Sequence, residues 1–165
     1  MATVLHRGVD VHTVGELPAV GAVLPGFTLT ASDLAEFGPE IAAGRRLVLN
    51  IFPSVDTGTC ALSVRKFNQL AAGLENTLVL CVSADLPYAQ ARFCGAEGIQ
   101  NVVTGSSFRS SFGSDYGVTL LDGPMRGLLS RAVVVADVDG TVRHTEQVPN
   151  ISTEPDYDAA LAALD

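Results

Sequence analysis

The sequence predicts an α/β fold in which helices flank a central mixed β-sheet and an N-terminal β-hairpin precedes it. Three dense apolar runs have the length of strands and lie at residues 47–52, 77–83 and 132–136. Helix signals follow the first two runs, and strands that alternate with helices are typical of an α/β sheet. Because 47% of the 165 residues are hydrophobic, the chain can bury a sizeable core, and we expect a single domain over residues 1–165.

The N-terminal part of the chain is predicted to be mostly extended. Residues 3–14 form two short alternating runs on either side of Arg7-Gly8, which indicates a hairpin that turns at this dipeptide. Two prolines and two glycines make residues 16–26 an extended connection. We expect a short strand over 27–30 and one or two helical turns within 33–43.

The central strand and the helix after it enclose the most informative segment. Residues 47–52 form an apolar run that Pro53 ends, as expected for a strand buried on both faces of a sheet. A loop over 54–59 then leads to a helix predicted from about Cys60 to Leu74, whose apolar side chains form a partial helical stripe.

The second half of the chain continues the alternation. Residues 77–83 predict another apolar strand, and Pro87 suits the first turn of a helix that runs to about Gly95. The remaining predicted elements are a strand over 101–104, a helical turn over 106–112, a loop over 113–124, a strand over 132–136, a turn over 137–140, a strand over 141–148 and a helix over 156–164. This order of elements is thioredoxin-like with an N-terminal addition.

The charge pattern argues against several kinds of partner. The net charge is −8, with 18 acidic and 10 basic residues, and the densest basic group is Arg45-Arg46. Such a chain repels phosphate backbones and anionic lipid, so we expect neither nucleic-acid nor membrane binding. No apolar run approaches the roughly 18 residues of a membrane span, and residues 1–14 lack the apolar stretch of a signal peptide. A cytoplasmic location is therefore expected.

The three cysteines call for different interpretations. An odd number without regular spacing does not fit a secreted disulfide scaffold. Cys81 lies within an apolar strand, where a small packing residue is the better interpretation. Cys94 could be either a packing residue or a redox partner on this reasoning. No metal-ligand spacing connects the histidines to the cysteines, and no phosphate-binding loop follows a strand, so we expect no metal and no cofactor.

The third cysteine, Cys60, lies where a helix is predicted to begin. A cysteine in the first turn of a helix is close to unpaired backbone N–H groups and the positive end of the helix dipole, and both favour the thiolate. Thr57 places a hydroxyl three residues earlier, and Pro53 offers an apolar wall that would shield the sulfur from water. This arrangement predicts a nucleophilic sulfur.

The pattern Pro53-x-x-x-Thr57-x-x-Cys60 resembles the active-site motif of the peroxiredoxins. Further blocks, in the same order along nearly the whole chain, resemble the bacterial thiol peroxidase branch of that family. These blocks are Asn50–Thr57, Thr13–Pro18, Ser83–Pro87, Arg92–Ala96 and Asp122–Met125.

The resemblance implies a thioredoxin-like enzyme that reduces hydrogen peroxide and alkyl hydroperoxides without metal or flavin. It implies that Cys60 attacks the peroxide, that Cys94 resolves the resulting sulfenic acid into an intrachain disulfide, and that Thr57 aligns the peroxide. Arg131 matches the family arginine whose guanidinium lies beside the reactive sulfur. A thioredoxin-type protein would reduce the disulfide, and a homodimer is the common assembly.

One position departs from the family pattern. The residue after Thr57 is usually proline, and here it is Gly58, which is expected to loosen the loop slightly without preventing the chemistry. Two alternatives remain open. A peroxide-sensing relay would use the same thiol to pass a disulfide to a partner, whereas a general thiol–disulfide oxidoreductase would normally carry a C-x-x-C pair, which is absent.

Overall fold

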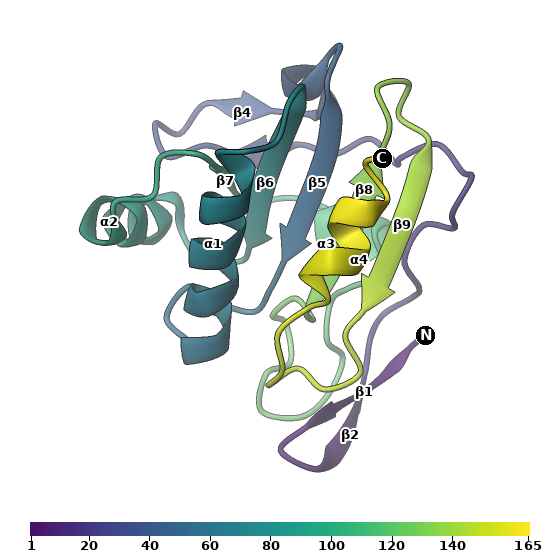
Figure 1. The fold of residues 1–165 in the computed structure, drawn as a ribbon. Coiled ribbons are helices and arrows are strands. Elements are labelled where there is room, and N and C mark those ends of the chain that lie inside the picture. The colour runs from purple at the N-terminus through teal and green to yellow at the C-terminus, as the bar shows by residue number, and fades with distance from the viewer.

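A computed structural model describes all residues, 1–165, as a seven-stranded sheet with helices on both faces and a separate N-terminal hairpin (Figure 1). The strand order is β4-β3-β7-β6-β5-β8-β9, and the sheet is mixed. Strands β7, β6 and β5 run parallel, whereas β8 pairs antiparallel with β5 and β3 pairs antiparallel with β7. The predicted α/β class and mixed sheet are confirmed.

The hairpin consists of β1 (Thr3–His6) and β2 (Val9–His12), joined by a two-residue turn at Arg7-Gly8. Both turn residues have positive φ, 52° and 79°, as a type I′ turn requires. The hairpin is tied to the C-terminal part of the chain, because Leu5 donates to the carbonyl of Pro149 and accepts from the N–H of Ile151. The extended connection that follows is also as predicted.

Two apolar strands have the predicted bounds: β6 (Thr77–Ser83) and β8 (Ala132–Ala136). The strand β5 (Arg46–Ile51) lies between them, and its alternate side chains enter the cores on opposite faces of the sheet. The last strand, β9 (Val142–Gln147), pairs with β8 after the predicted turn.

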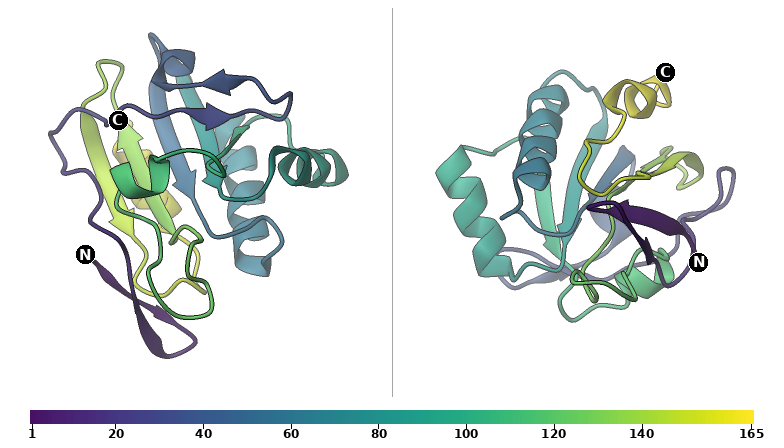
Figure 2. Two further views of the ribbon diagram at one scale, coloured as in Figure 1. Left: turned by 180° about the vertical axis from the view of Figure 1, so that it is seen from behind. Right: turned by 90° about the horizontal axis from the view of Figure 1, so that it is seen from below.

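The helices divide between the two faces, as Figure 2 shows from behind and below. On one face, α1 (Gly58–Ala71) and α4 (Tyr157–Ala162) cover a core that includes Phe67 and Ala160. The larger core lies on the other face, under α3 (Phe112–Asp115) and the extended N-terminal segment. The remaining helix, α2 (Pro87–Glu97), joins β6 to β7 (Val103–Ser106).

Three local predictions require correction. Between residues 33 and 43 the chain forms β4 (Glu36–Phe37), which pairs with β3 (Leu29–Thr30), before a single 3₁₀ turn at Pro39–Ala42. The strand predicted at 101–104 occupies Val103–Ser106, so the helical turn predicted at 106–112 begins only at Phe112. The ladder continues to Ser106 because its Cα partners are Ser83 and Thr30, and neither long-range pairing is visible in local sequence. No helix has both the length and the apolar character needed to cross a bilayer.

Candidate active site

Cys60 lies in the first turn of α1, at its third residue, directly after the loop that follows β5. The helix begins two residues earlier than predicted because Thr57 serves as its N-cap, with extended backbone angles of φ −95° and ψ 146°. The Oγ1 of Thr57 accepts the N–H of Cys60 at 3.3 Å and donates to the carbonyl of Ser54 at 3.4 Å. The predicted placement of Cys60 at a helix start is therefore confirmed.

The guanidinium of Arg131 lies beside the sulfur of Cys60. Arg131 directly precedes β8, and its side chain is almost completely buried, with 1% of the residue exposed. Its Nη2 lies 3.2 Å from Cys60 Sγ, and its Nε donates to the carbonyl of Ile151 at 2.8 Å. The Nη1 atom has no hydrogen-bond partner. A buried cation with one free donor favours negative charge on its neighbours and on a bound ligand.

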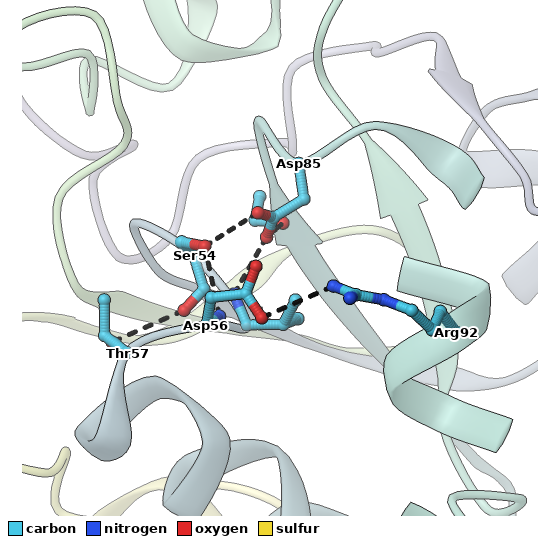
Figure 3. A network of polar contacts seen from close by, with 7 residues as sticks. Ser54, Asp56, Thr57, Asp85 and Arg92 are labelled. Atoms are coloured by element: carbon cyan, nitrogen blue, oxygen red, sulfur yellow. Dashed lines mark hydrogen bonds and ion pairs between the residues drawn. The ribbon is translucent and has the colours of Figure 1, made fainter. Parts of the chain in front are cut away.

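The carboxylate of Asp85 holds the loop between β5 and α1 in place (Figure 3). Asp85, between β6 and α2, accepts the hydroxyl of Ser54 at 2.7 Å and the N–H of Val55 at 2.8 Å. It also accepts the hydroxyl of Ser83 at 2.6 Å. Hydrogen bonds to a carboxylate are stronger than neutral ones, so Asp85 fixes the loop that carries Thr57 toward Cys60.

The same loop contacts α2 through an exposed ion pair. Figure 3 shows Arg92 of α2 reaching toward Asp56, with 3.6 Å between Nη2 and Oδ1. Both side chains are about two-thirds exposed, so this pair contributes little to stability. It nevertheless places α2, which carries Cys94, against the loop that leads to Cys60.

All three cysteines are free thiols, and they belong to one apolar cluster. Cys60 and Cys81 are completely buried, whereas Cys94 is half-buried at the edge of the cluster. Burial raises the pKa of Cys94 from its ordinary value, opposed in part by a hydrogen bond with Thr104. Burial also raises the pKa of Cys81 to about 12. Cys81 is thus a buried packing residue, as predicted.

A pocket of about 430 Å³ lies beside Thr57 and Arg131. Three of the predicted site residues line it, namely Pro53, Thr57 and Arg131, and the sulfur of Cys60 is one hydrogen bond away from its Arg131 wall. Cys94 does not line the pocket. The structure therefore brings four of the five predicted residues together and places the fifth on a neighbouring helix.

Several residues of the site were not predicted. Asp85 lies within the recognised block Ser83–Pro87, but nothing in that block shows that its carboxylate reaches the loop after β5. Ile151 and the hairpin turn also border the pocket, and only the tertiary fold brings them there. The one available signal was the unusual choice of arginine, at Arg7, for a tight turn.

Comparisons with known proteins identify the family of the chain. Residues 19–161 match the family model described as Redoxin. The chain is 59% identical over 164 residues to a thiol peroxidase of Mycobacterium tuberculosis and 58% identical to one of Corynebacterium glutamicum, with 99% of each chain covered in both cases.

The solved structures give the same result. A peroxiredoxin-like protein from Aquifex aeolicus superposes with a TM-score of 0.93 at 38% identity, covering 99% of this chain and 96% of that chain. A thiol peroxidase from Chromobacterium violaceum has the same fold, with a TM-score of 0.92 at 23% identity over the same shares of the two chains. The thioredoxin-like fold is thus confirmed, and the relay alternative is not favoured. The chain belongs to the Redoxin family, among its peroxiredoxin-type thiol peroxidases, and it is an oxidoreductase that reduces peroxide with a thiol.

Proposed function

We propose that Cys60 is the thiol that attacks peroxide and that Cys94 resolves its oxidised form. The observation that supports the first role is the 3.2 Å contact between the buried guanidinium of Arg131 and Cys60 Sγ. A permanent cation at this distance stabilises the thiolate, which is the nucleophilic form of cysteine. The helix start adds backbone dipoles of the same sign.

In the first step, the Cys60 thiolate attacks one oxygen of the hydroperoxide and the O–O bond breaks. The sulfur becomes a sulfenic acid, and the other oxygen leaves as an alcohol or water after taking up a proton. Negative charge moves from the sulfur to the leaving oxygen during this step. The unpartnered Nη1 of Arg131 is a donor available for that oxygen, and preorganised donors of this kind lower a barrier because they need no reorganisation.

In the second step, the Cys94 thiol condenses with the sulfenic acid, forming a disulfide and releasing water. The two thiols are free here. A disulfide needs Cα atoms within about 7 Å and a suitable sulfur geometry, and we propose that local unwinding of α2 allows Cys94 to reach it. The helix suits this step because it has no side-chain N-cap and buries only Pro87, Gln90 and Phe93.

The cycle closes when a dithiol protein reduces the disulfide and is itself oxidised. A thioredoxin-type reductant fits this chemistry because it supplies two electrons from a dithiol. Hydrogen peroxide and alkyl hydroperoxides are the proposed substrates, the homodimer is the proposed assembly, and the cytoplasm is the proposed location. Gel filtration with light scattering tests the assembly directly.

The three cysteines allow a matched test of the proposed roles. Reduced protein is treated with one equivalent of hydrogen peroxide and followed by intact mass and peptide mapping. We expect the wild type to lose two hydrogens and to yield a 60–94 linkage within one chain. Cys94→Ser should stop after gaining oxygen on Cys60, and Cys60→Ser should consume no peroxide.

Cys81→Ser is the control, since it removes a thiol of the same cluster that has no proposed role. It should behave like the wild type. Full peroxide consumption by Cys60→Ser would disprove the nucleophile assignment, and a linkage between two chains would disprove the intrachain disulfide. Sustained NADPH oxidation with thioredoxin and its reductase separates a turning-over enzyme from a relay, which would be oxidised once.

A further inference from the structure

The pocket beside Cys60 is larger than hydrogen peroxide requires. Its volume is about 430 Å³, whereas a water molecule takes up only about 30 Å³ in the liquid and hydrogen peroxide is not much larger. The pocket volume falls within the usual range for small organic ligands. Part of its wall is apolar, provided by Pro124, Met125, Leu128 and Ile151. These features fit a hydroperoxide that carries an organic chain.

The charges around the pocket have one sign. The charged residues of its lining are Arg7 and Arg131, with no aspartate or glutamate, although the whole chain has 18 acidic residues and only 10 basic ones. Arg131 is already engaged with Cys60 and Ile151, whereas Arg7 is exposed and makes no ion pair or side-chain hydrogen bond. The outer part of the pocket therefore presents an uncompensated cation.

Arg7 also occupies a backbone position that disfavours it. Its φ of +52° lies in the left-handed region, where type I′ turns strongly prefer asparagine, aspartate or glycine. Turn formation alone therefore gives no reason for an arginine here. A side chain at a disfavoured backbone position is a reason to look for a role of that side chain.

The hairpin turn is held firmly relative to the catalytic groups. The Ile151 peptide accepts from Arg131 Nε through its carbonyl and donates to the carbonyl of Leu5 through its N–H. Arg7 is only two residues beyond Leu5. Val4 and Val11 of the hairpin are buried with Leu120 and Ile151, and this packing fixes the turn at the edge of the pocket.

We propose that Arg7, assisted by His6, forms an anion subsite that selects organic hydroperoxides carrying a carboxylate. The –OOH end reaches Cys60, the hydrocarbon part lies on the apolar wall, and the carboxylate lies at the hairpin turn. The subsite does not touch the reacting atoms, so it determines which hydroperoxide is preferred. This inference rests on the proposed role of Cys60.

The test uses two probes with the same reacting group, one anionic and one neutral: ω-hydroperoxyoctanoic acid and its methyl ester. The ratio of their second-order rate constants for Cys60 oxidation, compared between wild type and variants, reports on recognition of the carboxylate. We expect the wild type to prefer the acid by about two- to fivefold at low salt, the size of one exposed ion pair. The preference should shrink at high salt because exposed charges are screened.

The informative variant is Arg7→Asn, because Asn-Gly is the preferred type I′ sequence and the turn should remain intact. It should abolish the preference for the acid, so that the acid-to-ester rate ratio falls to about one. Arg126→Gln is the matched control. Arg126 is also exposed, lies in the loop beside the pocket without lining it, and its substitution removes the same charge.

Three outcomes would overturn the subsite. Equal rates for acid and ester in the wild type, a preference that survives in Arg7→Asn, or an equal loss in Arg126→Gln would each exclude a local role for Arg7. Hydrogen peroxide serves as the reference for the underlying chemistry. If it failed to oxidise Cys60 at all, the proposed function itself would fall, whereas normal oxidation by hydrogen peroxide with no acid preference would refute the subsite alone.

Discussion

Replacing Gly58 with proline is expected to stabilise the protein. Gly58 is the first residue of α1, the position where proline fits a helix best. Its N–H makes no hydrogen bond that proline would remove, and a Cβ added there meets no atom within 4 Å. The preceding residue, Thr57, already has the extended backbone angles that a following proline requires.

The size of the effect follows from the unfolded state, because proline restricts the unfolded chain more than glycine does. A compatible substitution of this kind contributes about 0.4–1 kcal/mol to the free energy of unfolding. For a chain of this length, that corresponds to an increase in Tm of about 1–4 °C. The hydrogen bond between Thr57 and Cys60 is retained, so the rate of peroxide reduction should not fall.

The assay is urea unfolding of the reduced protein, combined with the rate of reaction with hydrogen peroxide. Gly140→Pro provides the opposite control, since Gly140 has a φ of +82° and its N–H donates to Asp137. That variant should lose more than about 1 kcal/mol. A lower unfolding free energy for Gly58→Pro would refute the reasoning, because it would mean that the helix start depends on the freedom of glycine.

Four further predictions concern the site and its surroundings. Arg131→Met should lower the rate of Cys60 oxidation by a factor of about 10²–10³, which is the effect of losing one preorganised donor. Arg131→Lys should recover this rate only in part. An unchanged rate in stopped-flow measurements of Arg131→Met would rule out the proposed role. Asp85→Asn should lower the free energy of unfolding by about 1–2 kcal/mol and slow peroxide reduction, because a charged acceptor of three hydrogen bonds becomes neutral. A loss of stability without a loss of rate would show that Asp85 does not position the loop. Hydrogen bonds from His12 lower the pKa of Asp122 below its ordinary value of 3.8. The ionised carboxylate therefore stabilises the fold at pH values above 3.8, and this stabilisation is lost as the pH falls through the lower pKa of the folded state. Acid unfolding monitored by circular dichroism should be less steep in Asp122→Asn. Burial raises the pKa of Cys94 above its ordinary value of 9.0, so alkylation of Cys94 by iodoacetamide in the reduced protein should be slow at neutral pH and still be rising with pH at pH 9. Fast alkylation at pH 7 would contradict this.

Local sequence was sufficient to predict the elements whose burial is uniform. The strands at Thr77–Ser83 and Ala132–Ala136 are buried on both faces of the sheet. Each coincides with an apolar run, so the sequence predicts where the strand begins and where it ends. The hairpin at Arg7-Gly8 was predictable because short alternating runs flank this dipeptide, whereas its type I′ geometry is known only from the structure. Short elements such as Glu36–Phe37 escaped prediction because they exist only through pairing with distant strands, which two residues cannot reveal.

The site was predictable as far as its motif extends. The segment from Pro53 to Cys60 is continuous in sequence, and the electrostatics of a helix start follow from it directly. The resemblance supplied Arg131 and Cys94. Neither source could supply Asp85, because its contribution depends on the position of one carboxylate across the end of the sheet, and the position of Arg7 depends on a hairpin docked against the C-terminal part of the chain.

The complete burial of Cys60 has a consequence for competing reactions. Its sulfur exposes no surface, although a pocket wall lies one hydrogen bond away. A narrow –OOH group needs less room at the sulfur than a tripeptide thiol or its disulfide does, so we expect this burial to favour reaction with the peroxide. We therefore expect Cys60 to form mixed disulfides with small thiols only slowly. The same burial should protect Cys60 from bulky electrophiles. The width of an electrophile, more than its intrinsic reactivity, should then determine whether it reaches this sulfur.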